Sequence, residues 1–141
     1  MKIFFIALVA SIGIFGKTNT TRLPFSDSYN FTSTQMNFEL SIPPELKSKL
    51  LIDETESAVV FRYENPGTDH AVFLFSITRV SESAFMQVKD NLTSANVLSN
   101  KNGLITYSET TDEKSLPEKN KTEFKQILSR INEVLKTFKE I

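Results

Sequence analysis

The apolar periodicity of residues 124–141 constrains the fold of this chain more than any other feature. Large apolar side chains recur there at intervals of three and four, and mostly polar side chains fill the positions between them. This spacing predicts a long amphipathic helix that buries one stripe against another layer of the protein. A coiled-coil seam has a similar spacing, but the stripe is short and follows a strand-rich region, which favours a helix on a core. The stripe comprises Phe124, Ile127, Leu128, Ile131, Val134, Leu135, Phe138 and Ile141.

Upstream of this helix the sequence has the period of two that is typical of half-buried strands. Residues 36–42 alternate apolar and polar side chains, and Pro43-Pro44 ends the pattern. Two shorter strands are predicted over residues 51–54 and 58–64. The folded part is therefore expected to begin with an opening strand, a proline turn and two further strands.

The strand predicted over residues 71–80 should lie in the middle of the sheet. Its first half is apolar at every position, and a strand of this kind needs cover on both faces. The turn residues 65–69 are expected to join it to the preceding strand as a hairpin. Ser81 is then predicted to cap a short helix in which Phe85 supplies a hydrophobic staple.

Residues 95–100 and 104–110 are predicted to form a second hairpin, because Asn102 and Gly103 tolerate the positive φ of a tight turn. The whole order of elements predicts an α+β fold for residues 34–141. In this fold a mainly antiparallel β-sheet is sandwiched between helices, one of them the long C-terminal amphipathic helix. At this length one domain with its own core is expected.

The first sixteen residues have the pattern of a secretion signal. Lys2 supplies a positive charge, and residues 3–15 form an uncharged apolar run. This run is short for a membrane-spanning helix, which needs about 20 residues, but it suits a cleavable signal. An uncleaved anchor or a buried first helix is the alternative. We therefore predict a signal peptide over 1–16, export to the exterior or the periplasm, and no stable membrane span after cleavage.

Residues 17–33 are predicted to form a polar leader, because they are rich in Thr, Ser and Asn. A few apolar side chains in this leader can lie along the domain as an edge strand: Leu23, Phe25, Tyr29 and Phe31.

Charge and cysteine usage narrow the classes of partner. The formal charge is −1, and a near-neutral balance argues against nucleic acid and against an anionic membrane surface. The chain has no cysteine, so it folds by packing alone and cannot be lipidated on an N-terminal cysteine.

No catalytic, metal or cofactor motif stands out in the sequence. His70 is the only histidine and lies beside Asp69, whereas zinc sites take three or four ligands, so a solvated turn residue is favoured. Paired carboxylates can hydrolyse glycosides, but loop acids are more often solvated. The two acidic clusters are Asp53, Glu54 and Glu56, and Glu109, Asp112 and Glu113. We predict no catalytic residue, no metal and no cofactor.

A set of aromatic side chains on the predicted strands is the candidate ligand groove. The set is Phe61, Tyr63, Phe73, Phe75 and Tyr107. Some of these rings could line a groove, although burial in the sheet core is the favoured use of large aromatics.

Four Asn-x-Thr sequons are present, at Asn19, Asn30, Asn91 and Asn120. In a eukaryotic secretory route they could carry glycans, whereas in a bacterium they would be chance products of the composition.

The layout resembles the PsbP-like superfamily, which includes small exported bacterial proteins. The stretches that carry the resemblance are Phe38-Glu39-Leu40-Ser41-Ile42-Pro43, Leu74-Phe75-Ser76-Ile77, Gly103-Leu104-Ile105-Thr106-Tyr107 and Ile131 through Lys139. Bacterial members often have a Trp after the proline, where this chain has Leu46, and many have a lipidated cysteine, which is absent here. The resemblance implies an α/β/α sandwich and a binding or accessory role, and it implies no catalytic residue.

Two functions follow from these observations. The first is a non-enzymatic exported domain that binds an unknown protein or small ligand through a sheet face or edge, for example as an inhibitor or immunity-type partner of a secreted effector. The alternative is a small secreted hydrolase that uses loop carboxylates or His70.

Overall fold

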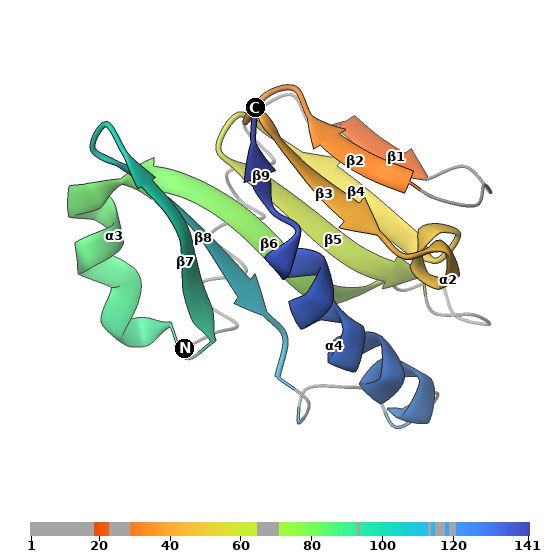
Figure 1. Cartoon of the computed structure of the whole chain (residues 1–141). Coiled ribbons are helices and arrows are strands. Elements are labelled where there is room, and N and C mark those ends of the chain that lie inside the picture. Colours follow the sequence, from red (N-terminus) through yellow and green to blue (C-terminus); the bar gives the residue numbers. More distant parts are fainter. Residues whose placement is uncertain are drawn as a thin grey trace.

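The structure, a computed structural model of the chain, describes residues 19–22, 29–64, 71–92, 94–112, 114, 118 and 121–141. It is an α+β fold with two antiparallel sheets and a C-terminal helix, α4 (Lys121–Lys136) (Figure 1). The predicted α+β class, the antiparallel pairing and the closing helix are therefore confirmed. The predicted signal peptide and His70 lie outside the described residues.

The larger sheet has six strands in the order β1-β4-β5-β6-β8-β7. The strand β6 lies between β5 and β8, which confirms the prediction of a central strand. Asn102 and Gly103 have φ angles of 55° and 75° at the turn between β7 and β8, as the predicted hairpin requires. The six strands are β1 (Asn19–Arg22), β4 (Leu50–Glu54), β5 (Ala58–Glu64), β6 (Ala71–Ser81), β8 (Leu104–Thr110) and β7 (Ala95–Lys101).

The smaller sheet consists of β2 (Tyr29–Ser33), β3 (Phe38–Ile42) and β9 (Lys139–Glu140), with β3 in the middle. The sequence predicts one sheet that includes the opening strand at 36–42, and this is wrong, because β3 pairs with β2 and β9 and not with a strand of the larger sheet. The alternation correctly indicates which side chains of β3 are buried. It does not indicate to which sheet the strand belongs.

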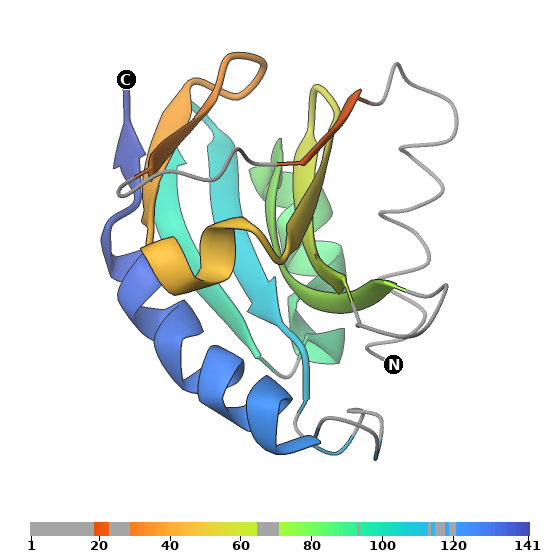
Figure 2. The ribbon, with the colours of Figure 1, turned by 90° about the vertical axis from the view of Figure 1, so that its right-hand side faces the viewer.

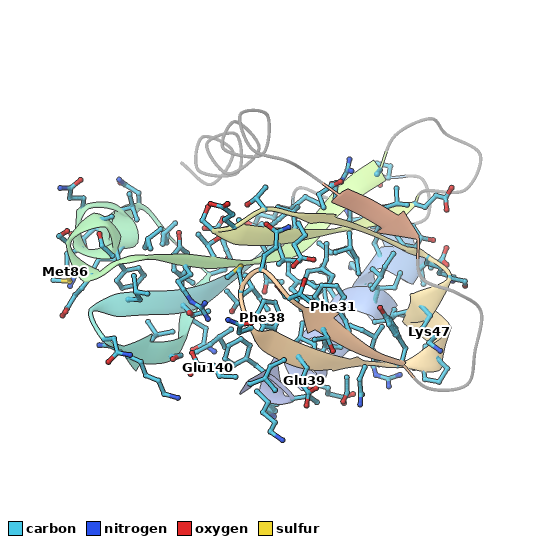
Figure 3. All side chains as sticks on the ribbon, turned by 90° about the horizontal axis from the view of Figure 1, so that it is seen from above. Phe31, Phe38, Glu39, Lys47, Met86 and Glu140 are labelled. Carbon is cyan, nitrogen blue, oxygen red and sulfur yellow. The ribbon has the colours of Figure 1, made fainter. Side chains whose placement is uncertain are left out.

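The smaller sheet packs on one face of the larger sheet through aromatic side chains. The ring of Phe31 lies 5.4 Å from that of Phe61 in an edge-to-face arrangement, and Phe61 stacks on Phe75 at 4.3 Å. Seen from above, Phe31 and Phe38 lie between the two sheets (Figure 3). Part of the leader was expected to lie along the domain as an edge strand. The strand β2 does so at the edge of the smaller sheet, with Phe31 and Ser33 buried.

Helix α4 covers the same face of the larger sheet as the smaller sheet does. Phe124 is fully buried, and its ring lies 4.6 Å from that of Tyr63 on β5. The buried part of the predicted stripe is Phe124, Ile127, Ile131, Val134 and Leu135. The core therefore forms where the amphipathic stripe meets the sheet.

The prediction that the C-terminal helix continues to residue 141 is wrong. The helix ends at Lys136, and the Thr137 hydroxyl donates to the carbonyl oxygen of Val134 at 2.6 Å. Phe138 then packs on Phe38, with ring centroids 5.3 Å apart, and β9 pairs with β3. The apolar spacing continues past Lys136 because Phe138, although it is no longer helical, still packs against the core.

On the opposite face of the larger sheet, α3 (Glu82–Val88) packs on β8. A 3₁₀ turn (Lys89–Asn91) extends this helix. As predicted, Ser81 caps α3: its Oγ accepts a hydrogen bond from the amide of Ala84 at 3.2 Å. Phe85 packs on Tyr107 at 5.1 Å. Figure 2 shows α3 and α4 on opposite sides of the sheet. A further helix among the described residues is the single turn α2 (Pro44–Lys47).

Candidate binding groove

The predicted aromatic groove is not an open surface. Phe61, Tyr63, Phe75 and Tyr107 are each at most 1% exposed, and Phe73 is partly buried. Tyr107 packs with α3, whereas the other three buried rings belong to the main core on the opposite face. The structure therefore does not bring the five rings together, and four of them serve as core, the use that the sequence favoured.

The first acidic cluster is divided between the two faces of the larger sheet. Asp53 and Glu54 are neighbours on β4, so their side chains point in opposite directions. Asp53 forms an ion pair with Arg62. Glu54 accepts a hydrogen bond from Ser33 Oγ at 2.6 Å and thereby links the two sheets. These are strand residues with structural partners rather than the predicted loop carboxylates.

The second acidic cluster is also not a loop cluster. Glu109 lies on β8 and is 1% exposed. Asp112 follows that strand and accepts a hydrogen bond from the amide of Lys114 at 3.0 Å. Glu113 and His70 lie outside the described residues. Within the described part of the chain, no group of His, Asp and Glu side chains could hold a metal ion.

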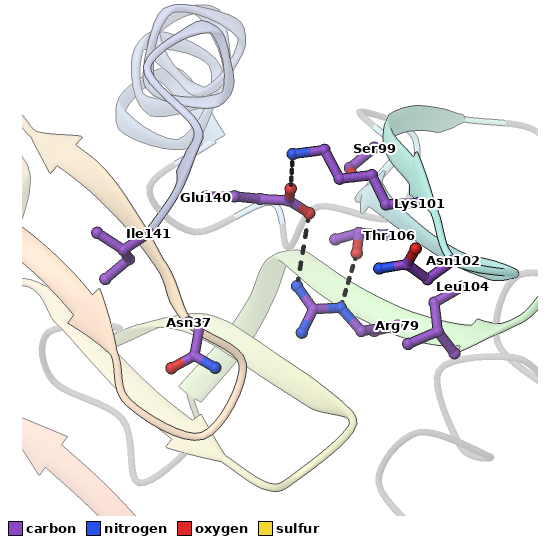
Figure 4. A pocket seen from close by; sticks show the side chains of 9 residues that line it. All are labelled: Asn37, Arg79, Ser99, Lys101, Asn102, Leu104, Thr106, Glu140 and Ile141. Carbon is purple, nitrogen blue, oxygen red and sulfur yellow. Dashed lines mark hydrogen bonds and ion pairs between the residues drawn. The ribbon is translucent and has the colours of Figure 1, made fainter.

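Two separate cavities lie along β7, one at residues 94–98 and the other at residues 99–102, in a region that the sequence did not indicate. Together we call them the seam groove, which lies between the β7–β8 hairpin on one side and residues 132–141 on the other. The wider cavity, of about 500 Å³, is lined by Ser94, Asn96, Val97, Leu98, Ser108, Thr110, Asn132, Leu135, Lys136 and Phe138. The narrower one, of about 200 Å³, is lined by Asn37, Arg79, Ser99, Lys101, Asn102, Leu104, Thr106, Glu140 and Ile141 (Figure 4).

The strand β7 forms the outer edge of the larger sheet and borders the seam groove. Three successive residues of this strand, 96–98, line the wider cavity. The pairing of β7 with β8 shifts register between Val97 and Ser99, so successive residues at this irregularity line the cavity. Asn96, Val97, Asn100 and Lys101 of this strand are exposed.

The narrower cavity contains a cluster of charged side chains. Lys101 Nζ lies 2.6 Å from the carboxylate of Glu140, and Arg79 Nη2 lies 3.8 Å from it. The hydrogen bond from Lys101, followed by that from Ser99, lowers the pKa of Glu140 below its ordinary value. This cluster links β7 to the C-terminal segment across the seam groove.

A further cavity, of about 520 Å³, lies between α2 and α4. Two ion pairs cross it, one between Arg130 and Glu45 and one between Lys49 and Glu123. The hydrogen bond from Lys49 lowers the pKa of Glu123. This cavity lies between two helices, whereas the seam groove borders the edge strand β7, so the seam groove is the better candidate.

Sequence analysis missed the seam groove because its walls are far apart in the chain. Its uncharged polar lining on β7 and β8 consists of Ser, Thr and Asn, residue types that are equally typical of solvated strand positions. One signal was available: β7 has a less regular apolar pattern than the predicted inner strands, as expected for an edge.

Comparisons with protein-family models, with curated proteins and with solved structures found no match. The resemblance to the PsbP-like superfamily is therefore still a prediction.

Proposed function

We propose that this chain is an exported, non-enzymatic binding domain, and that an extended segment of a partner protein binds in the seam groove by pairing with β7. The observation that carries the proposal is the coincidence of a sheet edge with a cavity long enough for several side chains. Peptides commonly bind to exposed sheet edges by adding a strand, with pockets beside the edge giving specificity.

The backbone of β7 is suited to accept such a strand. In a two-residue hairpin the pair next to the turn, here Lys101 with Leu104, exchanges backbone hydrogen bonds. At the next pair, Asn100 with Ile105, the N–H and C=O groups of Asn100 therefore point away from β8. A partner strand can pair with these groups without disturbing the hairpin.

The lining of the wider cavity suits an extended peptide. Leu98, Leu135 and Phe138 offer apolar contact, and they are partly or fully buried against the core. Around them, the side chains of Asn96, Thr110 and Asn132 can bind the backbone of an incoming segment. The hydroxyls of Ser94 and Ser108 donate to the carbonyl oxygens of Thr110 and Asn96 and hold the hairpin together. A mixed lining of this kind is common in sites that bind by shape and a few hydrogen bonds.

An edge-blocking variant tests this proposal. Asn100→Pro removes the outward N–H and leaves the pairing of β7 with β8 in place, because proline is tolerated at sheet edges. The matched control is Asn100→Ala, which keeps the N–H. Mature protein should recover a partner from the extracellular or periplasmic fraction of its own organism in the wild-type and Asn100→Ala forms, but not in the Asn100→Pro form. Equal recovery by all three forms would exclude strand addition at β7.

The proposal also includes export of the chain and a PsbP-like fold. The apolar run at 3–15 after Lys2 supports a cleaved signal, and N-terminal sequencing of the exported protein should find Lys17 first. In the described residues no helix is long and apolar enough to cross a membrane. We also propose a PsbP-like sandwich; the central strand and the helices on opposite faces support it, and the separate smaller sheet is the feature that an experimental structure should check.

A further inference from the structure

We infer that the narrower cavity of the seam groove is a binding site for a carboxylate of an acidic peptide, and that Glu140 is the chain's own occupant of this site. This inference rests on the proposed function, because the acidic side chain would come from the segment that pairs with β7.

The cavity is dominated by hydrogen-bond donors. Arg79 comes from β6, and Lys101 and Asn102 come from the end of β7 and its turn, so three segments of the hairpin region supply donors to one space of about 200 Å³ (Figure 4). Among the described residues that line it, Glu140 alone has a carboxylate side chain. Two cationic side chains therefore face one acidic side chain.

The guanidinium of Arg79 is held in place but not saturated. Its Nε donates to Thr106 Oγ1 at 3.0 Å, which fixes the plane of the group. Its Nη2 is 3.8 Å from Glu140, which is an ion pair but too long for a hydrogen bond. Arginine binds carboxylates best through two parallel hydrogen bonds, and a carboxylate closer to Arg79 than that of Glu140 could form them.

The tether of Glu140 is short. The strand β9 has two residues, which pair with Phe38 and Glu39 of β3, and the amide of Ile141 adds one hydrogen bond to the carbonyl oxygen of Asn37 at 3.0 Å. The residue after it, Ile141, is 66% exposed. A partner carboxylate can thus take the place of Glu140 at Lys101 without disturbing the core, because the buried stripe of α4 ends before β9.

The charged side chains that line the seam groove indicate which kind of peptide fits it. Besides Arg79 and Lys101, the seam groove has Lys136 at its other end. Of the described side chains that line the two cavities, three are basic and one is acidic, so this lining is cationic on balance. An extended acidic peptide matches both the direction of the groove and its charge.

The test uses the full mature chain and a fluorescently labelled, capped oligoglutamate peptide, which stays extended at neutral pH because its charges repel. Binding is measured by anisotropy at low salt. Glu140→Gln should bind the peptide about fivefold more tightly, since the competing internal acid is gone. Arg79→Gln should weaken binding about tenfold. Lys89→Gln, which removes an exposed charge beside α3 on the opposite face, should have little effect.

Three results would overturn the inference: equal losses in Arg79→Gln and Lys89→Gln, weaker or unchanged binding in Glu140→Gln, or displacement of the peptide by sodium acetate at equal carboxylate concentration. The last result would mean a small-anion site. Failure here is distinct from failure of strand addition: partner capture that still depends on the N–H of Asn100 would preserve the proposed function without the acidic specificity. Conversely, oligoglutamate binding that depends on Arg79 but not on Asn100 would preserve the carboxylate site alone.

Discussion

One face of the larger sheet is closed at one end and open at the other. Over β4, β5 and β6 the smaller sheet and α4 bury Phe61, Tyr63 and Phe75 almost completely. Over β8 the same face carries Thr106 and Ser108, which are each 1% exposed. At β7, where Asn96 and Lys101 are exposed, the face borders the seam groove. The cover on this face therefore extends over β8 and stops at β7.

The difference lies in the side chains as much as in the cover. At the closed end the contacts are ring to ring, which resist removal because each lost ring leaves a cavity. At the open end the smaller sheet and the β7–β8 hairpin are joined by the ion pairs of Glu140 with Lys101 and Arg79. Ion pairs near the protein surface contribute little to stability, so rearranging the open end should cost less free energy than rearranging the closed end.

Truncation of the helix anchor should have the largest effect of the substitutions considered. Phe124→Ala removes a fully buried ring that packs on Tyr63, so the free energy of unfolding should fall by about 3–5 kcal/mol. Urea denaturation followed by circular dichroism measures the change. The control, Met86→Ala on exposed α3, should stay within about 0.5 kcal/mol; equal effects would mean that α4 does not lie on the sheet.

The hydrogen bond that joins the two sheets at the closed end should come next. Ser33 Oγ donates to Glu54 and accepts from the amide of Met36 at 3.0 Å, and Ser33 is fully buried. Ser33→Ala leaves these groups without their partner and should lower the free energy of unfolding by about 2 kcal/mol. Ser41→Ala, at an exposed position of β3, is the matched control and should change it far less. Equal losses of unfolding free energy in the two variants would mean that the hydrogen bond of Ser33 does not stabilise the packing of the two sheets.

The open end should show the smallest effect, and one that depends on pH. Because the hydrogen bond from Lys101 lowers the pKa of Glu140, the ionised carboxylate stabilises the fold above its ordinary pKa, and this contribution is lost as the pH falls through the lowered value. At pH 7, Glu140→Gln should therefore cost about 0.5 kcal/mol. In acid the variant and the wild type should converge. Lys101→Gln should lose the same pH-dependent part, and a constant difference at every pH would contradict the pairing.

The closed end was largely predictable from the sequence, and the open end was not. The spacing of Phe124, Ile127 and Ile131 and the apolar run at the start of β6 fixed the helix, the central strand and the core, because burial follows periodicity. Periodicity could not say that Phe38 belongs to a second sheet or that the chain leaves the helix after Lys136. It also could not bring Arg79, Lys101 and Glu140 together, since only the fold makes these distant residues neighbours.

Amide hydrogen exchange, recorded for the chain alone and for its complex with the captured partner, tests strand addition in the seam groove most directly. The account predicts new protection at Asn100 and its neighbours on β7, and altered exchange over residues 137–141, with no change in β5. New protection over α2 and the first turns of α4, with β7 unchanged, would contradict it.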